Sequence, residues 1–170
     1  MLIFEGFLIL LFLAIAISFV YAGHLAAPWL PTPHGTVKHF LHVAEIKQGD
    51  VVFDLGCGDG RIISAAAKQG AEAIGFEISV MPYLLGRIRL LFTHHAKILF
   101  KNFWHADFSK ANLIYIFLLP KVYPALVKKI QNECKPGTRI ISCAWPIETW
   151  QPIKISEGKR TIDRFYFYQI

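Results

Sequence analysis

A short apolar run that ends in a glycine-spaced loop is the feature that most constrains the fold of this chain. Residues Val51 to Arg61 read Val-Val-Phe-Asp-Leu-Gly-Cys-Gly-Asp-Gly-Arg, and a helical pattern continues to Lys68. Gly56, Gly58 and Gly60 can take backbone angles that a Cβ bars, and they let a ligand lie almost against the main chain. The following helix points its free N–H groups at that ligand. The stretch therefore predicts a strand, a loop and a helix around a nucleoside-binding site.

An ordinary tight turn would show the same glycine spacing, but an acidic residue further along the chain, Glu77, favours a binding site over a plain turn. The strand-like run Glu72 to Phe76 ends in Glu77, about twenty residues after the loop, where a dinucleotide fold places its ribose-binding carboxylate. NAD-type sites instead use Gly-x-Gly-x-x-Gly and hold a pyrophosphate at the helix N-terminus. Here Asp54 and Asp59 bring negative charge to the loop, which repels a pyrophosphate but suits a sulfonium or an amino group. The pattern favours S-adenosylmethionine over NAD.

The loop, read as Asp54-Leu-Gly-Cys-Gly-Asp-Gly60, resembles motif I of the class I, seven-strand methyltransferases. Most of the chain after residue 30 also resembles the small membrane-anchored protein-lysine methyltransferases, through the stretches Pro31-Thr-Pro33, Gly75-Phe-Glu77, Lys101-Asn-Phe-Trp104 and Trp145-Pro-Ile-Glu-Thr-Trp-Gln-Pro152. The mitochondrial members of that family modify the ATP synthase c subunit and the adenine nucleotide translocase. The resemblance implies S-adenosylmethionine as the cofactor and a protein lysine as the methyl acceptor.

Three polar residues are expected at the edge of the sheet that binds the cofactor. In an open parallel sheet, a ligand lies outside the carboxyl ends of the strands, near the point where the strand order reverses. Asp54, Glu77 and Asn102 end three neighbouring strands of the predicted sheet. We expect Asp54 to face the cofactor's amino group, Glu77 to bind the ribose and Asn102 to meet the adenine edge. The full cofactor-binding set that we predict is Asp54, Gly56, Cys57, Gly58, Asp59, Gly60, Glu77 and Asn102.

Two members of this set need comment. The similar methyltransferases tend to carry Asp in place of Asn102, but an Asn carbonyl can also accept a hydrogen bond from the adenine amino group. Cys57 lies where the loop needs a small side chain, so we interpret it as a packing residue rather than a nucleophile. With Cys134 and Cys143 the cysteines are odd in number and lack metal-ligand spacing, which indicates a reducing compartment. The spacing of His94 and His95 is poor for a set of metal ligands, so we interpret the pair as part of a solvated turn and predict no metal site.

The methyl acceptor is expected to meet an aromatic wall. Methyl transfer is an in-line displacement, so the protein must align the acceptor with the methyl group. Aromatic faces can hold a lysine cation, and desolvation lowers the pKa of its amine. No Asn-Pro-Pro-Tyr signature follows the fourth strand, which counts against methylation of nucleic acid bases or glutamine amides. Trp104 is a candidate wall, whereas Tyr115 and Phe117 are expected to pack inside a buried strand. We name no catalytic residue, and the substrate-pocket residues that we predict are Pro120, Trp145 and Trp150.

Hydrophobic periodicity predicts an α/β fold for most of the chain. Strand-like runs at 51–55, 72–76, 96–100, 113–118 and 139–144 alternate with helical patterns, of which the clearest are 36–46, 61–69, 79–92 and 121–134. Such alternation indicates parallel strands joined by crossover helices. Near the end, residues 152–155 and 162–168 predict an antiparallel hairpin. We expect a Rossmann-like, doubly wound, mostly parallel seven-strand sheet with a C-terminal antiparallel hairpin.

The first residues predict a single transmembrane helix. From Phe7 to Ala22 there is no charge, and a helix from Leu2 to Ala22 would be about 31 Å long, enough to cross a bilayer core. Pro28 would end this helix, and Trp29 suits a membrane interface. The alternative is a cleaved signal peptide, since Val20-Tyr-Ala22 loosely fits the cleavage rule, but the run is long and no Lys or Arg precedes it. We predict an anchor at 1–23, a linker at 24–36 and a methyltransferase domain at 37–170.

The charge of the chain fits a domain beside a membrane. All 18 Lys and Arg residues follow the apolar segment, which by the positive-inside rule places the domain on the cytoplasmic side. Glu5 is the one acid of the anchor, so 11 acids remain against these bases, a net charge of about +7. A basic surface can attract anionic lipid or nucleic acid. The bases are scattered and form no long Arg-rich block, which favours the membrane and predicts no nucleic-acid partner.

Three functions remain open from the sequence. The leading one is a membrane-anchored, S-adenosylmethionine-dependent protein-lysine N-methyltransferase that acts on a membrane-associated protein. The second keeps the cofactor but methylates a small molecule, a lipid or a quinone. The third is a non-catalytic module that binds S-adenosylmethionine to sense it or to dock a partner. Turnover separates the third function from the first two, and the chemistry of the methylated product separates those two from each other.

Overall fold

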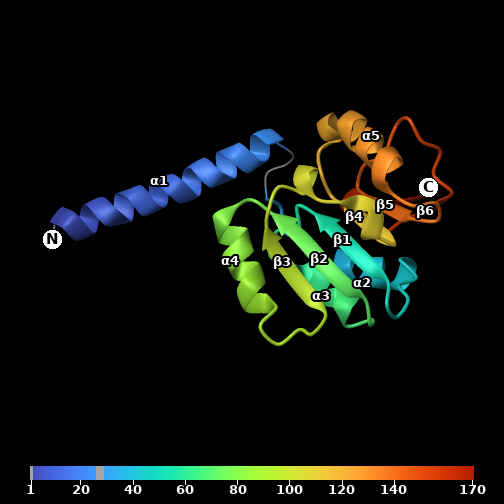
Figure 1. Ribbon diagram of the computed structural model, residues 1–170, viewed down its shortest axis with the longest axis horizontal. Coiled ribbons are helices and arrows are strands. Elements are labelled where there is room, and N and C mark those ends of the chain that lie inside the picture. The colour runs from blue at the N-terminus through green and yellow to red at the C-terminus, as the bar shows by residue number, and fades with distance from the viewer. Residues whose placement is uncertain (1, 26–28) are drawn as a thin grey trace.

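A seven-stranded mixed sheet with helices on both faces, and one long helix that extends from it, make up the computed structural model, which describes residues 2–25 and 29–170 (Figure 1). The strand order is β3-β2-β1-β4-β5-β7-β6. The strands are β1 Val51–Leu55, β2 Glu72–Glu77, β3 Ala96–Phe100, β4 Leu113–Ile116, β5 Arg139–Cys143, β6 Lys154–Ser156 and β7 Phe165–Gln169. The α-helices are α1 Leu2–Leu25, α2 His34–Val43, α3 Arg61–Ala67, α4 Val80–Arg89 and α5 Tyr123–Glu133. Short 3-10 turns are η1 Phe103–His105, η2 Phe108–Lys110, η3 Pro120–Val122 and η4 Thr161–Asp163.

The pairing of the strands confirms the predicted fold. Strands β1 to β5 run parallel, whereas β7 is antiparallel to both β5 and β6, which confirms the C-terminal hairpin. The strand order reverses between β1 and β4, the position at which open α/β sheets bind ligands. In the register of the sheet, Asp54 of β1 lies beside Gly75 of β2 and Tyr115 of β4. Two parallel neighbours therefore flank Asp54 at the carboxyl edge.

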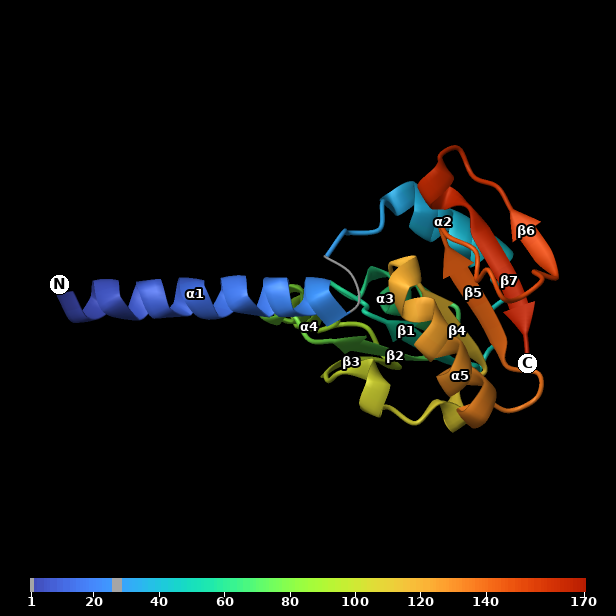
Figure 2. The ribbon, with the colours of Figure 1, turned by 90° about the horizontal axis from the view of Figure 1, so that it is seen from above.

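Apolar side chains cover both faces of the sheet and fix the helices on it. On one face, α2, α3 and α4 pack over a cluster that includes Phe40, Ile63 and Tyr115. On the other, α5 and the 3-10 turns η1, η2 and η3 pack over Phe53, Phe108 and many aliphatic residues. Figure 2 shows these two layers from above. Because both faces are covered, the central strands are mostly apolar, as buried parallel strands are expected to be.

Several element boundaries differ from the sequence expectation by a few residues. Helix α2 begins at His34, inside the predicted linker, because Pro33 precedes it with a φ of −61° that suits the entry to a helix. Helix α4 ends at Arg89 instead of residue 92, and η3 occupies the first turn of the helix expected at 121–134. Pro28, expected to end the first helix, lies outside the described residues.

Helix α1 projects from one side of the sheet domain (Figures 1 and 2). Residues Phe4–Gly23 have a mean hydropathy of 2.4, and of these only Ala22 is buried. By length and composition the helix could cross a membrane, but a signal sequence can have the same length and composition. Its end is tied to the domain, because the Val80 N–H donates to Ser18 Oγ at 3.4 Å and Lys121 Nζ donates to the Gly23 carbonyl at 3.0 Å.

Candidate functional site

The glycine loop between β1 and α3 has the backbone that the sequence predicts. Gly56, Gly58 and Gly60 have φ values of 80°, 55° and 72°, in the region that favours glycine. The N–H groups of Gly56 and Cys57 both donate to the Phe76 carbonyl at 3.0 Å, which fixes the loop to the end of β2. Gly60 precedes α3 as its N-cap and does not line the cavity described next.

A cavity opens at the carboxyl edge of the sheet, next to this loop. It brings together seven of the eight residues that we predicted for the cofactor, all except Gly60. The aromatic side chains that line it, here called its aromatic side, are Trp29, Phe76, Phe103, Trp104, Tyr115, Phe117 and Trp145, and the end of α1 contributes Ala22. The cavity thus combines acidic and backbone groups, here called its acidic side, with aromatic side chains, a combination that suits a cationic nucleoside and a cationic acceptor.

Asp54 places an unpaired carboxyl group in this cavity. Its side chain is 3% exposed, and among the described residues no group makes a hydrogen bond to its carboxylate. Burial, reinforced by the charges of Glu77 and Asp59, raises the pKa of Asp54 well above its usual value. A cation that entered the cavity would stabilise the ionised carboxylate. Asp54 therefore has the properties expected of a residue that faces an ammonium or a sulfonium group.

Glu77 does more than the sequence indicated, because its carboxylate also holds the loop. Oε2 accepts a hydrogen bond from the Gly58 N–H at 2.9 Å, and Oε1 accepts from the N–H groups of Ile78 and Ser79 at 2.8 and 2.7 Å. A carboxylate has about four acceptor positions. With three in use, about one remains, and the predicted hydrogen bond from a ribose hydroxyl would use it. Periodicity and spacing locate Glu77 but do not reveal these backbone contacts.

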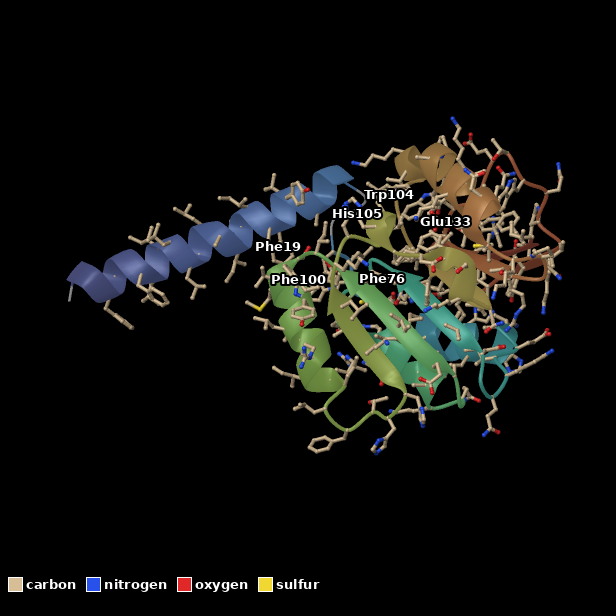
Figure 3. All side chains as sticks on the ribbon, in the orientation of Figure 1. Phe19, Phe76, Phe100, Trp104, His105 and Glu133 are labelled. Carbon is tan, nitrogen blue, oxygen red and sulfur yellow. The ribbon has the colours of Figure 1, made fainter. Side chains whose placement is uncertain are left out.

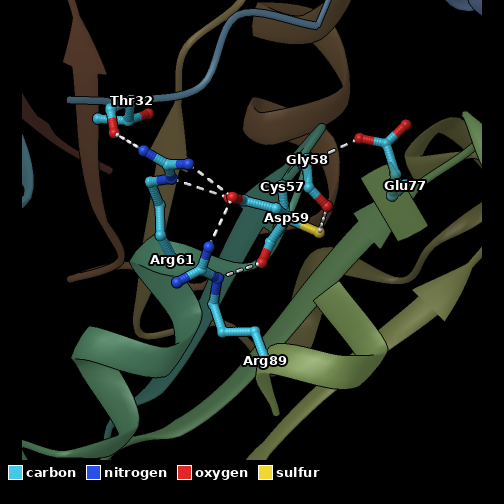
Figure 4. Close-up of polar contacts among 7 residues, drawn as sticks. All are labelled: Thr32, Cys57, Gly58, Asp59, Arg61, Glu77 and Arg89. Atoms are coloured by element: carbon cyan, nitrogen blue, oxygen red, sulfur yellow. Dashed lines mark hydrogen bonds and ion pairs between the residues drawn. The ribbon is translucent and has the colours of Figure 1, made fainter. Parts of the chain in front are cut away.

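The carboxylate of Asp59 is bound by two arginines (Figure 4). Arg61 donates to both carboxylate oxygens at 2.8 and 2.5 Å, and Arg89 donates to Oδ2 at 2.8 Å and to the Asp59 carbonyl at 2.9 Å. Burial opposes the ionised form, but the hydrogen bond and charge of Arg61, with those of Arg89, hold the pKa of Asp59 below its usual value. Arg61 also donates to the Thr32 carbonyl, so this ion-pair cluster joins the loop to the linker.

Asn102 uses its side-chain oxygen as a cap. Its Oδ1 accepts a hydrogen bond from the Trp104 N–H at 3.1 Å at the start of η1. Among the described residues, no acceptor faces its side-chain amide N–H₂ group. The oxygen that we expected to receive the adenine amino group is thus partly occupied, and the amide is free to donate to an adenine ring nitrogen. An Asp at this position would have no such donor.

Trp29 is a site residue that the sequence did not predict. We expected it at a membrane interface, but its indole lies over the glycine loop, with Nε1 only 2.6 Å from where a Cβ on Gly58 would lie. Its ring centroid is 6.2 Å from that of Phe19 on α1. No periodicity or motif links residue 29 to the loop, because the contact depends on how the linker folds back over the sheet.

The predicted substrate-pocket residues fall in different places. Trp145 lines the cavity and stacks on Phe117, with ring centroids 5.8 Å apart and an angle of 22° between the planes. Pro120 starts η3, is exposed and does not line the cavity. Trp150 packs against Tyr168 at 5.6 Å, away from the cavity, because a turn closed by the Trp150 N–H and the Ile147 carbonyl reverses the chain. Only Trp145 of the three remains a candidate wall of this cavity.

Tyr115 was expected to pack in the core, and it does so while also lining the cavity. Its ring contacts Phe40, with centroids 5.0 Å apart. Its hydroxyl is buried near Thr32 and Cys143 but makes no hydrogen bond of normal geometry with a described residue. Burial raises the pKa of Tyr115 well above its usual value, so the hydroxyl is neutral and can serve as a donor.

The cysteines and histidines form no further reactive group in the described part of the chain. Cys57 packs under Gly75 in the core, and burial raises the pKa of its thiol well above the usual value. This supports its interpretation as a packing residue. His95 pairs with Glu72 at 2.5 Å on the surface. Within residues 2–25 and 29–170, no group of three or more His, Cys, Asp or Glu side chains is arranged to hold a metal ion.

Comparisons with known proteins identify the family of the chain. Residues 54–154 match the ANTKMT methyltransferase domain. A protein-lysine N-methyltransferase of Saccharolobus islandicus (strain REY15A) is 39% identical over 146 residues, 81% of this chain and 89% of that protein. The lysine N-methyltransferase of the ATP synthase c subunit from Xenopus laevis is 34% identical over 155 residues, 88% of this chain and 68% of that protein. An RNA methyltransferase of Salinibacter ruber in complex with S-adenosyl-L-homocysteine has a TM-score of 0.77 at 29% identity, covering 83% of this chain and 94% of that one.

Proposed function

The chain belongs to the family of the ANTKMT methyltransferase domain. We propose that it is held at a membrane by its N-terminal helix and transfers methyl groups to a lysine of a membrane-associated protein. The fold and the family make it an S-adenosylmethionine-dependent methyltransferase. The names of its relatives in Saccharolobus islandicus and Xenopus laevis support a protein lysine as the acceptor. The anchor, the membrane-associated substrate and the roles of single residues are parts of this proposal.

The residues of the cavity fit S-adenosylmethionine. When bound, this cofactor supplies a methyl group on a positively charged sulfur. In the proposed arrangement Asp54 meets the cofactor's ammonium group, Glu77 uses its remaining acceptor position for the ribose, and the Asn102 amide donates to the adenine edge. A Cβ at Gly56 would lie 3.1 Å from Leu118, and one at Gly58 would collide with Trp29, so the loop leaves no room for a larger residue.

The aromatic side of the cavity is proposed to receive the lysine. The side chains of Trp104 and Trp145 are partly exposed, so a substrate can reach them, and both line the cavity. Their faces can hold an ammonium group, and removal from water lowers the pKa of its amine. Loss of a proton frees the lone pair that must attack in line. The chain aligns and desolvates the acceptor and needs no covalent intermediate.

The N-terminal helix is proposed to hold the domain on the cytoplasmic side of a membrane. The charge-free stretch from Phe7 to Ala22 and its exposure in the structure support an anchor, and the position of all Lys and Arg residues after it supports that orientation. Ala22 of this helix lines the cavity, so the site lies close to the end of the anchor. A lysine near the bilayer surface would meet it at high effective concentration.

The observation that carries this proposal is the unpaired Asp54 carboxyl in a cavity whose other side is aromatic. The test is mass spectrometry of the membrane proteome from cells with the native chain and with an Asp54→Asn variant. We expect at least one methylated lysine to disappear in the variant. Unchanged lysine methylation with loss of a methylated lipid or quinone would support the small-molecule alternative. Retained cofactor binding without any lost methylation would support a binding module.

A further inference from the structure

Helix α4 and the turn after it expose a continuous apolar surface, here called the α4 face. Its large members are Ile88, Leu91 and Phe92, which are 65%, 69% and 93% exposed, and Met81, Leu84 and Leu85 are exposed beside them. Phe100 of β3 is exposed next to this helix (Figure 3). Soluble proteins rarely leave so many large apolar side chains together in water, and such patches mark interaction sites.

The α4 face lies on the side of the domain from which α1 projects. The Val80 N–H at the start of α4 donates to Ser18 Oγ of α1, so the two helices meet at this point. Figure 1 shows α4 at the margin of the domain next to α1, running across the direction of α1 rather than along it. If α1 stands in a bilayer, α4 lies along its surface.

The charge around the α4 face fits an anionic surface. The chain carries no Asp or Glu from residue 78 to residue 106, whereas Arg87, Lys97 and Lys101 lie in this segment. Arg89 also lies there but is paired with Asp59. Arg87 donates to the Tyr83 hydroxyl at 3.0 Å and lies over its ring, which holds one cation on the helix. Apolar residues flanked by cations are typical of helices that lie in the interface of anionic membranes.

We propose that the α4 face rests on an anionic phospholipid surface, with Ile88, Leu91 and Phe92 in the boundary between headgroups and acyl chains. This inference rests on the proposed anchor and extends it, because it adds a contact between the domain itself and the bilayer. A second contact fixes the domain on the bilayer. It holds the cavity, which Ala22 and Trp29 line, close to the membrane surface.

Lipid is favoured over a partner protein by position and charge together. Helices α1 and α4 lie next to each other and both expose large apolar side chains, so an anchored chain brings both to the same bilayer without any further protein. Residues 78–106 contain no Asp or Glu, so no carboxylate in this segment would repel an anionic headgroup. A protein partner is therefore treated as an outcome of the test.

The test uses the full chain in protein-free vesicles and an environment-sensitive fluorophore. In a Cys134→Ser background, which leaves two buried cysteines, the variants Ile88→Cys and Phe92→Cys are labelled with nitrobenzoxadiazole. The matched control is Ile153→Cys, which precedes β6 at the opposite end of the domain and is 68% exposed. Vesicles contain phosphatidylcholine with or without phosphatidylserine, and carbonate resistance reports the insertion of α1.

We expect labels at 88 and 92 to brighten several-fold in phosphatidylserine vesicles, to be quenched by lipid carrying a shallow nitroxide and to resist dithionite. The label at 153 should stay in water, and omission of phosphatidylserine should weaken the effect. If the labels at 88 and 92 stayed exposed to water on a chain that resists carbonate extraction, the α4 proposal would be wrong and the anchor would still be supported. Labels protected only in native membranes would overturn it in favour of a protein partner. A chain released by carbonate would overturn the anchor as well.

Discussion

The two sides of the cavity are built in different ways. The acidic side consists of a glycine loop and strand ends, and backbone hydrogen bonds such as those of the Phe76 carbonyl and the Glu77 carboxylate hold it together. The aromatic side consists of side chains from distant segments, for example Trp29 of the linker and Trp145 after β5. The acidic side follows from local sequence, whereas the aromatic side depends on how the segments pack. Substitutions on the two sides should therefore differ in kind as well as in size.

The largest effect is expected at Gly58. Gly58→Val places a branched side chain at a φ of 55° and against the Trp29 indole, so we expect cofactor affinity to fall by at least about 100-fold. Isothermal calorimetry on the folded variant measures this. The control is the double variant Gly58→Val/Trp29→Ala, which removes the collision with the indole. If the double variant regained native affinity, the loss would lie in the linker and the loop would not be the binding element.

A smaller loss is expected at Glu77. Removing a charged hydrogen bond costs about 1.5–3 kcal/mol, so Glu77→Ala should weaken cofactor binding about ten-fold to a hundred-fold. The loss of acceptors for the N–H groups of Gly58, Ile78 and Ser79 should also lower Tm. Glu72→Ala, in the same strand but exposed, is the matched control and should change neither value. A change in affinity below two-fold at Glu77 would remove it from the site.

Asp54 should make cofactor binding depend on pH. Its pKa is raised by burial and by the charges of Glu77 and Asp59, and a bound cation requires the ionised form. Affinity should fall about ten-fold for each pH unit below the raised pKa, and Asp54→Asn should bind weakly at every pH. A native affinity that does not vary with pH would show that Asp54 faces no cationic group.

The same substitution should stabilise the protein. The folded chain keeps a proton on Asp54 that the unfolded chain releases at pH values between 3.8 and the raised pKa. The free energy of unfolding therefore falls as pH rises through that window. Asp54→Asn removes this loss, so its Tm at neutral pH should exceed that of the native chain in the absence of cofactor. A lower Tm would mean that the carboxylate has a stabilising partner in the fold.

The two tryptophans near β5 provide the smallest and most specific comparison. Trp145→Ala should lower turnover several-fold with little change in cofactor affinity, because Trp145 lines the aromatic side. Trp150→Ala should instead lower stability, by about 1–3 kcal/mol for a partly buried ring packed on Tyr168, and leave turnover near normal. Steady-state kinetics and thermal unfolding separate the two results. Equal losses of turnover would contradict the placement of Trp150 outside the cavity.

The sequence predicted the acidic side of the cavity and the fold because both rest on short-range patterns. Alternating apolar runs determine the strands, and the positive φ angles at Gly56, Gly58 and Gly60 favour glycine. The acids at 54 and 77 then follow because parallel strands end at one edge. The sequence did not predict the role of each acid at that edge. Asp59 also belongs to the loop, but its charge is neutralised by Arg61 and Arg89.

The aromatic side was predicted only in part. Trp145 and Trp150 are close in sequence and look equivalent, but the turn at Ile147 sends them to different surfaces. Trp29 reaches the loop through a linker fold that no local pattern records. The α4 face has the same origin: a helical pattern predicts α4, but its outer surface becomes meaningful only once α1 is seen beside it.

The fate of the methyl group tests the proposed lysine methylation most directly. Native membranes are incubated with methyl-tritiated S-adenosylmethionine and either the native chain or its Glu77→Ala variant, and label is counted in hydrolysed protein, in solvent-extracted lipid and in RNA. We predict tritium in N-methylated lysine, dependent on the native chain and reduced at least about ten-fold with the variant at limiting cofactor. Chain-dependent tritium in lipid, quinone or RNA, with none in lysine, would contradict this function.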